Sequence, residues 1–110
     1  MLNQELDEVF RALADSTRRS LVAQLVPGPA AVSELARPHA MSLPAVMQHL
    51  SVLEKCGLVR SEKAGRVRTF HLEPAGLRSA EQWLGAQRTG WERCLDRLGD
   101  LLSGETGEPK

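Results

Sequence analysis

The sequence predicts a mainly α-helical domain that carries a single β-hairpin. Apolar residues recur every three or four positions over 2–13 and again over 77–102, which is the spacing of amphipathic helices. A serine-capped helix is expected at 43–56, and directly after it the apolar period shortens toward two over 58–63 and 67–72, as in paired strands. The chain has 110 residues, of which 42% are hydrophobic, so its size and composition fit one ordinary globular domain.

The N-terminal part of the chain is expected to hold three helices. The first covers 2–13, and Asp15 or Ser16 can then cap a second helix by accepting hydrogen bonds from its free backbone N–H groups. The Pro27-Gly28-Pro29 sequence ends this second helix. A third helix of barely two turns is expected over 32–36, with Ser33 near its start and Pro38 ending it.

The helix at 43–56 has the clearest end signals in the sequence. Ser42 is placed to cap it, and Pro44 fits its first turn because the N–H groups there have no helical partner. Gly57 suits a left-handed cap at its other end. The two strands of the hairpin follow and are joined around residues 64–66.

A last helical segment is predicted to begin after the Glu73-Pro74 break and to continue to Leu102, with a bend near Gly85 or Gly90. The residues after it are polar and include glycine. We therefore expect residues 1–102 to form a single domain and residues 103–110 to form a flexible tail.

A short helix joined by a tight turn to a capped helix is the arrangement of a helix-turn-helix motif, and a hairpin directly after it forms a wing. In this motif the second helix enters the major groove of DNA. At 100° per residue, Val46, Leu50 and Leu53 fall on one face of the capped helix, and small or polar residues without an acid fall on the other. The sequence therefore predicts a winged helix-turn-helix whose polar helix face meets DNA, although Glu54 at the side of that face weakens the pattern.

Ten residues are candidate contacts to double-stranded DNA. Gln48 can form two hydrogen bonds to adenine, while Leu43 and Met47 can meet thymine methyl groups. Ser42 can bind a phosphate at the helix N-terminus, although it is needed as a cap with or without DNA. The basic side chains of the hairpin suit the phosphate backbone or the adjacent minor groove. The full set is Ser42, Leu43, Pro44, Met47, Gln48, Ser51, Lys55, Lys63, Arg66 and Arg68.

The formal net charge is zero, but the charges are unevenly distributed along the chain. Residues 55–71 carry five cations and one acid, whereas residues 5–15 carry four acids and one cation. Residues 96–110 carry four acids and two cations. A basic middle between acidic ends is expected when only one surface of a protein meets phosphate.

Several other classes of protein are disfavoured by the sequence. No apolar run approaches the roughly 20 residues that cross a bilayer, and the acidic N-terminus is unlike a signal peptide, so we expect a cytoplasmic protein with no membrane partner. Cys56 and Cys94 are too isolated for a disulfide framework, and they are expected to be buried small apolar residues. His49 and His71 are expected to pack or to form hydrogen bonds, and no enzymatic motif is evident.

Three stretches of the chain resemble the ArsR/SmtB-like family of winged helix-turn-helix repressors. They are FRALADSTRR at 10–19, VSELA at 32–36 and SLPAVMQHLSVLEKCGLV at 42–59, of which the last is the most specific. The match covers roughly residues 5–73. The family usually has Gln at the position of Leu43 and often Ser at that of Met47, so these departures affect which operator is read and leave the fold unchanged.

The resemblance implies a homodimer built from the first and last helices, which binds a palindromic operator and commonly represses its own operon. The apolar stripes of the terminal helices are what such an interface requires. Trp83 and Trp91 fit an interface and an intramolecular core almost equally well. The expected interface residues are Leu2, Leu6, Val9, Phe10, Trp83, Trp91, Leu95, Leu98 and Leu102.

Many members of the family sense metals through cysteines in the short third helix or through His and carboxylates in the last helix. Here residues 34–38 read ELARP without a thiol, and no His follows His71, so neither a metal site nor a cofactor is expected. The chain therefore resembles a subgroup without metal sites, whose inducing signal is unknown. Two alternatives stay open: a repressor switched by oxidation of Cys56 or Cys94, and a protein-interaction or architectural module without an operator of its own.

Overall fold

A computed structural model of the chain describes residues 2–104 and has the mainly helical fold with a hairpin wing that the sequence predicts. The elements in this range are α1 (Leu2–Leu13), α2 (Ser16–Leu25), β1 (Ala30–Ala31), α3 (Val32–Ala36), α4 (Leu43–Lys55), β2 (Val59–Ala64), β3 (Val67–Leu72) and α5 (Pro74–Gly104). The chain divides after Ala80 into two compact units, so residues 2–80 and 81–104 are described separately.

Side-chain hydrogen bonds to backbone N–H groups lie at the starts of α2, α3 and α4. Asp15 caps α2 by accepting a 3.0 Å hydrogen bond from the backbone N–H of Arg18, and this bond is the main cause that lowers the pKa of Asp15. Ser42 caps α4 through a 3.3 Å bond from the N–H of Ala45, as predicted. Ser33 lies near the start of α3, as predicted, and the carboxylate of Glu34 accepts a hydrogen bond from the N–H of Ala31 at 2.9 Å.

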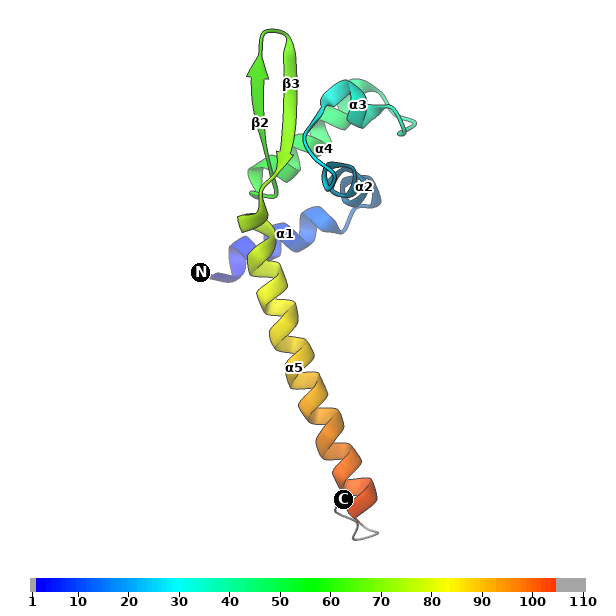
Figure 1. Cartoon of the computed structure of the whole chain (residues 1–110), viewed down its shortest axis with the longest axis vertical. Coiled ribbons are helices and arrows are strands. Elements are labelled where there is room, and N and C mark those ends of the chain that lie inside the picture. Colours follow the sequence, from blue (N-terminus) through cyan, green and yellow to red (C-terminus); the bar gives the residue numbers. More distant parts are fainter. Residues whose placement is uncertain (1, 105–110) are drawn as a thin grey trace. The chain divides into compact units, whose positions relative to one another are not determined.

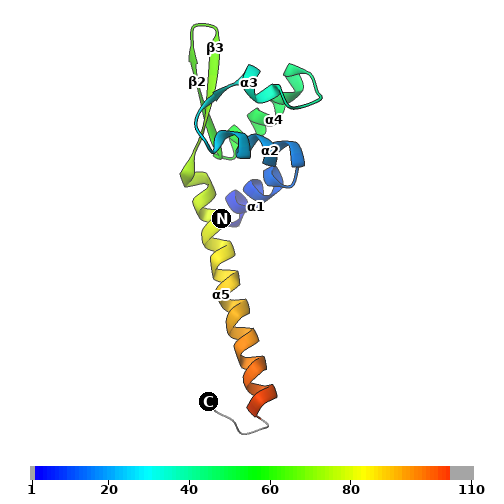
Figure 2. The ribbon, with the colours of Figure 1, turned by 45° about the vertical axis from the view of Figure 1, so that its right-hand side comes forward.

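The strands form one antiparallel sheet in the order β1-β3-β2. The β2 and β3 strands run side by side as a hairpin (Figure 1, Figure 2) and pair along their whole length, from Val59 with Leu72 to Ala64 with Val67. Gly65 in the turn has a φ of +65°, a conformation that favours glycine. The β2 strand begins one residue later than predicted because the N–H of Leu58 is bonded to Leu53 at the end of α4.

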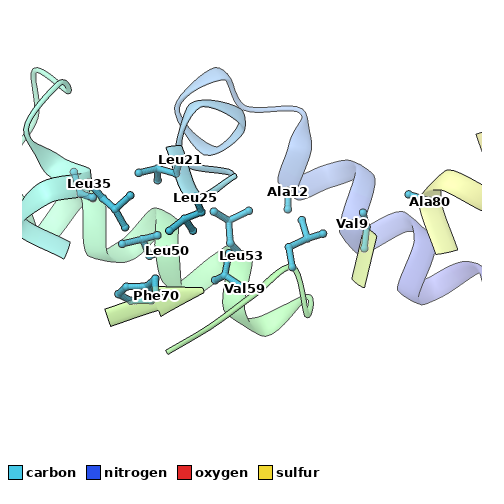
Figure 3. Close-up of a cluster of buried hydrophobic side chains, with 12 residues drawn as sticks. Val9, Ala12, Leu21, Leu25, Leu35, Leu50, Leu53, Val59, Phe70 and Ala80 are labelled. Atoms are coloured by element: carbon cyan, nitrogen blue, oxygen red, sulfur yellow. The ribbon is translucent and has the colours of Figure 1, made fainter. Parts of the chain in front are cut away.

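The core of the first unit lies between α1, α2, α4 and the sheet (Figure 3). The fully enclosed side chains include Leu21, Leu50, Leu53 and Phe70, each with at most 1% of its surface exposed. Val9 is only 2% exposed and belongs to this core. Its side chain is thus covered within the chain, and its place at a dimer interface stays a prediction.

The second unit consists of the part of α5 that follows Ala80. The α5 helix is continuous across Gly85 and Gly90, so the expected bend is absent in this described segment. Ser103 and Gly104 are also helical, whereas the rest of the predicted tail, 105–110, lies outside the described residues. The single domain over 1–102 stays a prediction. Within the described residues, no helix is both long and apolar enough to span a membrane.

Candidate nucleic-acid interface

The α4 helix has one enclosed face and one exposed polar face. Val46, Leu50 and Leu53 have no exposed surface, because this side of α4 packs into the core. Gln48 and Lys55 are exposed on the other side, and neither side chain forms a hydrogen bond or ion pair with any residue in 2–104. The buried and exposed faces of α4 are those expected for a helix with 100° per residue. The side chains of Gln48 and Lys55 are therefore available to bind an external partner.

The remaining candidate contacts on α4 differ in how much of each is accessible. Leu43 is 47% exposed, and Ser42 and Pro44 beside it are also exposed at the start of the helix. Met47 and Ser51 are half-buried, and Met47 packs against the core. The outermost positions are therefore those of the first turn together with Gln48 and Lys55.

Two positively charged residues of the wing lie directly opposite each other on the paired strands. Lys63 on β2 pairs in register with Arg68 on β3, so their side chains project from the same face of the hairpin. Like charges in this position repel each other unless an anion lies close to both. Arg66 is exposed in the turn, and neither Lys63 nor Arg66 is paired with a group in the described part of the chain. The end of the wing therefore suits binding to a phosphate.

The base of the wing has a different electrostatic character, because its cation is neutralised internally. Arg60 lies 3.1 Å from a carboxylate oxygen of Glu62 and 3.2 Å from one of Glu73. The Nε2 atom of His71 is buried and lies 3.4 Å from the other carboxylate oxygen of Glu62, without hydrogen-bond geometry. Arg60 thus contributes little to the basic surface that the charge count of 55–71 predicted.

A polar chain that the sequence reasoning missed connects the wing to α4. Arg68 donates from Nη1 to Oγ of Ser61 at 2.9 Å, and Ser61 donates to Oε2 of Glu54 at 3.0 Å. Ser61 occupies an inward position of β2, since it pairs with the buried Phe70. A hydroxyl at an inward strand position needs polar partners, and this was the available signal in the sequence.

His49 is hydrogen-bonded, as the sequence predicted for this residue. Its Nδ1 atom lies 3.2 Å from Nη1 of Arg18, and because a guanidinium can only donate, the imidazole nitrogen accepts. A carboxylate oxygen of Asp15 is 3.8 Å from the same nitrogen. This contact joins α4 to the start of α2 and leaves the adjacent Gln48 on the outer face.

The two cysteines differ in exposure. Cys56 is half-buried and burial raises the pKa of its thiol, which lowers the fraction of reactive thiolate. Cys94 is exposed, so the prediction that it is buried is wrong. No group of three or more His, Cys, Asp or Glu residues that could hold a metal ion occurs among the residues described.

The expected interface residues on α5 are exposed, and most of them share one face. Trp91, Leu95, Leu98 and Leu102 are 45% to 69% exposed, and at 100° per residue they fall within about 60° of one another. Trp83 lies about 90° from the middle of this stripe. Leu84, absent from the expected set, falls within the stripe and is 52% exposed.

The expected residues of α1 lie in the first unit. Leu6 and Phe10 are partly buried against its core. The side chain of Leu2 lies outside the described residues. The interface over both terminal helices stays a prediction.

A short helix, a turn, a capped helix with a free polar face and a basic hairpin together define a winged helix-turn-helix protein. Residues 13–62 match the family model described as a helix-turn-helix domain. The HTH-type transcriptional regulator Rv2034 of Mycobacterium tuberculosis is 43% identical over 99 residues, which are 86% of this chain and 92% of the relative.

Solved structures of transcriptional regulators also resemble this chain. The ArsR family transcriptional regulator RHA00566 superposes with a TM-score of 0.77 at 46% identity, over 82% of this chain and 93% of the other. A homodimeric winged helix-turn-helix DNA-binding domain from Mycobacterium bovis has a TM-score of 0.64 at 26% identity, over 84% of each chain. This chain belongs to the ArsR-like family of winged helix-turn-helix transcriptional regulators.

Proposed function

We propose that this regulator is a repressor that binds operator DNA specifically, as a homodimer and without sensing a metal. The observation that carries the proposal is the outer face of α4, where Gln48 and Lys55 are exposed and have no side-chain partner among residues 2–104, while the opposite face is enclosed. A buried face fixes the orientation of the helix, and the free face then offers hydrogen-bond donors and acceptors to base edges. Lys63 and Arg66 of the wing bind the adjacent phosphates.

The homodimer is supported by the apolar stripe of α5 and by the homodimeric relative from Mycobacterium bovis. Exposed large apolar side chains at this density are typical of interaction surfaces. Two copies related by a twofold axis read two half-sites that lie about 34 Å apart on one side of the duplex. Occupation of a promoter by such a dimer represses transcription, and the cytoplasm is where the protein acts.

The absence of metal sensing is proposed from the sequence, because residues 34–38 supply no thiol and no His follows His71. Zinc or nickel added to the purified protein is therefore expected to leave its affinity for DNA unchanged. A change of tenfold or more in that affinity, reversed by a chelator, would contradict this part of the proposal.

The experiment that tests the proposed function compares binding to promoter DNA of its own gene with binding to random DNA of equal length at several salt concentrations. Specific binding is expected to persist where the phosphate-driven part has faded. Equal affinity for the two DNAs at every salt concentration would contradict an operator and favour an architectural module.

Two substitutions separate base contacts from phosphate contacts. Gln48→Ala is expected to reduce discrimination among operator variants by roughly 1–3 kcal/mol at one base position, because a bidentate contact is lost. Arg66→Ala is expected to weaken binding to all sequences alike and to lower the salt slope by about one. If Gln48→Ala discriminates among operator variants as well as the unaltered chain does, Gln48 does not contact a base. If Arg66→Ala has an unaltered salt slope, Arg66 does not contact a phosphate.

A further inference from the structure

Arg68 differs from the other cations of the wing because its side chain is half-buried and already hydrogen-bonded. Its Nη1 atom donates to Ser61 at 2.9 Å, whereas Lys63 and Arg66 are exposed and unpaired within residues 2–104. A guanidinium held in this way is less available to a phosphate than the side chains beside it. The wing therefore has one cation that is bonded within the protein, Arg68, and two exposed cations, Lys63 and Arg66, that can bind an external anion.

Ser61 is the central member of the chain of hydrogen bonds. Its hydroxyl oxygen accepts from Arg68, and its proton is donated to Glu54 at 3.0 Å. A hydroxyl can fill both roles at once, so the two bonds are compatible. Glu54 lies in the last turn of α4, Ser61 on β2 and Arg68 on β3, so the bonds join both strands of the wing to the helix with the free polar face.

The position of this link matters because Arg66 lies at the end of a two-stranded ribbon. A hairpin is held by few contacts beyond its last packed residue, and Phe70 is the buried residue of β3 that lies nearest to the turn. The bonds of Ser61 and Arg68 act on the part of the hairpin that carries Lys63 and Arg66.

We propose that Arg68 and Ser61 are positioning residues that hold the wing at the angle needed for simultaneous contact of α4 and Arg66 with DNA. The inference rests on the proposed function. It assigns Arg68 to the protein's own structure, in place of the phosphate contact that its charge alone suggests. Preorganisation of this kind increases affinity because less conformational freedom is lost on binding.

The first test uses Ser61→Ala, which removes both hydrogen bonds without changing any charge. This variant is expected to bind promoter DNA about three- to tenfold more weakly, with an unchanged salt slope. Ser61→Thr keeps the hydroxyl and is expected to recover most of the affinity. Ser20→Ala is the matched control, since Ser20 is exposed and has no side-chain hydrogen bond within the described residues. Thermal unfolding of each variant confirms that it is folded.

The second test distinguishes positioning from phosphate contact at Arg68. Arg68→Ala is expected to weaken binding as much as Ser61→Ala does and to leave the salt slope unchanged, whereas Arg66→Ala lowers the slope by about one. The double variant of Ser61 and Arg68 is expected to be no weaker than either single variant, because both remove the same link.

The third test concerns Glu54, which carries a charge of its own. Glu54→Gln and Glu54→Ala both remove that charge, but only the amide can still accept the hydrogen bond of Ser61. The Gln variant is therefore expected to bind DNA about three- to tenfold more tightly than the Ala variant.

Two results would overturn the inference while the proposed function stands: wild-type affinity of Ser61→Ala, or a salt slope lowered by about one in Arg68→Ala. Failure of the unaltered chain to prefer promoter DNA would instead overturn the proposed function and, with it, the inference.

Discussion

Arg18 joins three parts of the first unit through one side chain. It donates to the carbonyl oxygen of Ala12 at 2.7 Å, to that of Arg11 at 3.3 Å and to His49 at 3.2 Å. The two carbonyl groups lie at the C-terminal end of α1, where a cation is favoured, and that of Arg11 also accepts a backbone hydrogen bond from Ala14. Arg18 therefore ties α1 to α4 and supports the helix that carries Gln48.

Asp15 provides a prediction about pH. Its pKa is lowered in the folded chain, chiefly by the hydrogen bond from the N–H of Arg18, so the ionised cap stabilises the fold above the ordinary pKa. This contribution is lost as the pH falls through the lowered value. Asn at this position can still cap α2 but cannot ionise.

Asp15→Asn is accordingly expected to be less stable than the unaltered chain at neutral pH, and the difference is expected to shrink as the pH falls below the ordinary pKa of an aspartate and through the lowered pKa of Asp15. Urea unfolding at several pH values measures it. A difference that stays constant across this range would contradict the assignment.

Local signals explain which single residues could be predicted from the sequence. Ser42 and Gly57 were recognised because a cap depends on its neighbours in sequence, and the structure has Ser42 bonded to Ala45 and Gly57 at a φ of +83°. The link from Arg68 to Ser61 was missed because it depends on the register of the hairpin. The charge of Arg68 indicated a cation on the wing, but could not indicate that Ser61 would bind it.

The junction of α4 and α5 depends on two glycines that approach closely. A Cβ atom at Gly76 would lie 2.0 Å from the carbonyl oxygen of Gly57, which is a backbone atom that cannot rotate away. The first turn of α5 therefore packs directly on Gly57, which follows the end of α4.

Gly76→Ala is expected to destabilise the fold by about 1–3 kcal/mol, although the same change in an open helix stabilises it. Gly90→Ala is the matched control, because Gly90 also lies in α5 and a Cβ there meets no atom within 4 Å. The free energy of unfolding of the Gly90→Ala control is expected to rise by about 0.5–1 kcal/mol. Denaturant unfolding measures both, and equal stability changes in the two variants would contradict the close approach.

The strength of each element's pattern decides how well its bounds could be predicted. The bounds of α1 agree with the prediction because its apolar period is unbroken. The β1 strand was missed, since two residues carry no period and Ala30 and Ala31 become a strand only by pairing with Phe70 and Thr69. The expected bend in α5 was wrong, because an isolated glycine lowers helix propensity by about 1 kcal/mol without ending a helix.

The whole molecule combines a neutral net charge with two surfaces that are separated along the chain. The exposed cations of α4 and the wing lie in residues 2–80, while the exposed apolar stripe lies in residues 81–104. The proposed DNA-binding surface and the proposed dimer interface can thus be altered independently. The homodimer proposed above predicts that loss of the stripe weakens DNA binding without unfolding the first unit.

Leu98→Glu is expected to convert a dimer into a monomer and to weaken binding to promoter DNA at least tenfold, because one copy holds only one half-site. Leu98 is 51% exposed within the chain, so its replacement does not open the core. Gln82→Glu is the control on the opposite face of α5 and is expected to remain dimeric. Sedimentation of both variants measures the mass, and a dimeric Leu98→Glu variant would place the interface elsewhere.

The proposed DNA-binding surface consists of α4 and the wing. It can be tested by recording backbone and side-chain amide NMR signals while promoter DNA is added to the protein. The largest shifts are expected on residues 42–55 and 63–68, including the side-chain amide of Gln48, and are expected to persist at salt concentrations that abolish shifts with random DNA. Shifts confined to other residues, with those of Gln48 and Arg66 unchanged, would contradict it.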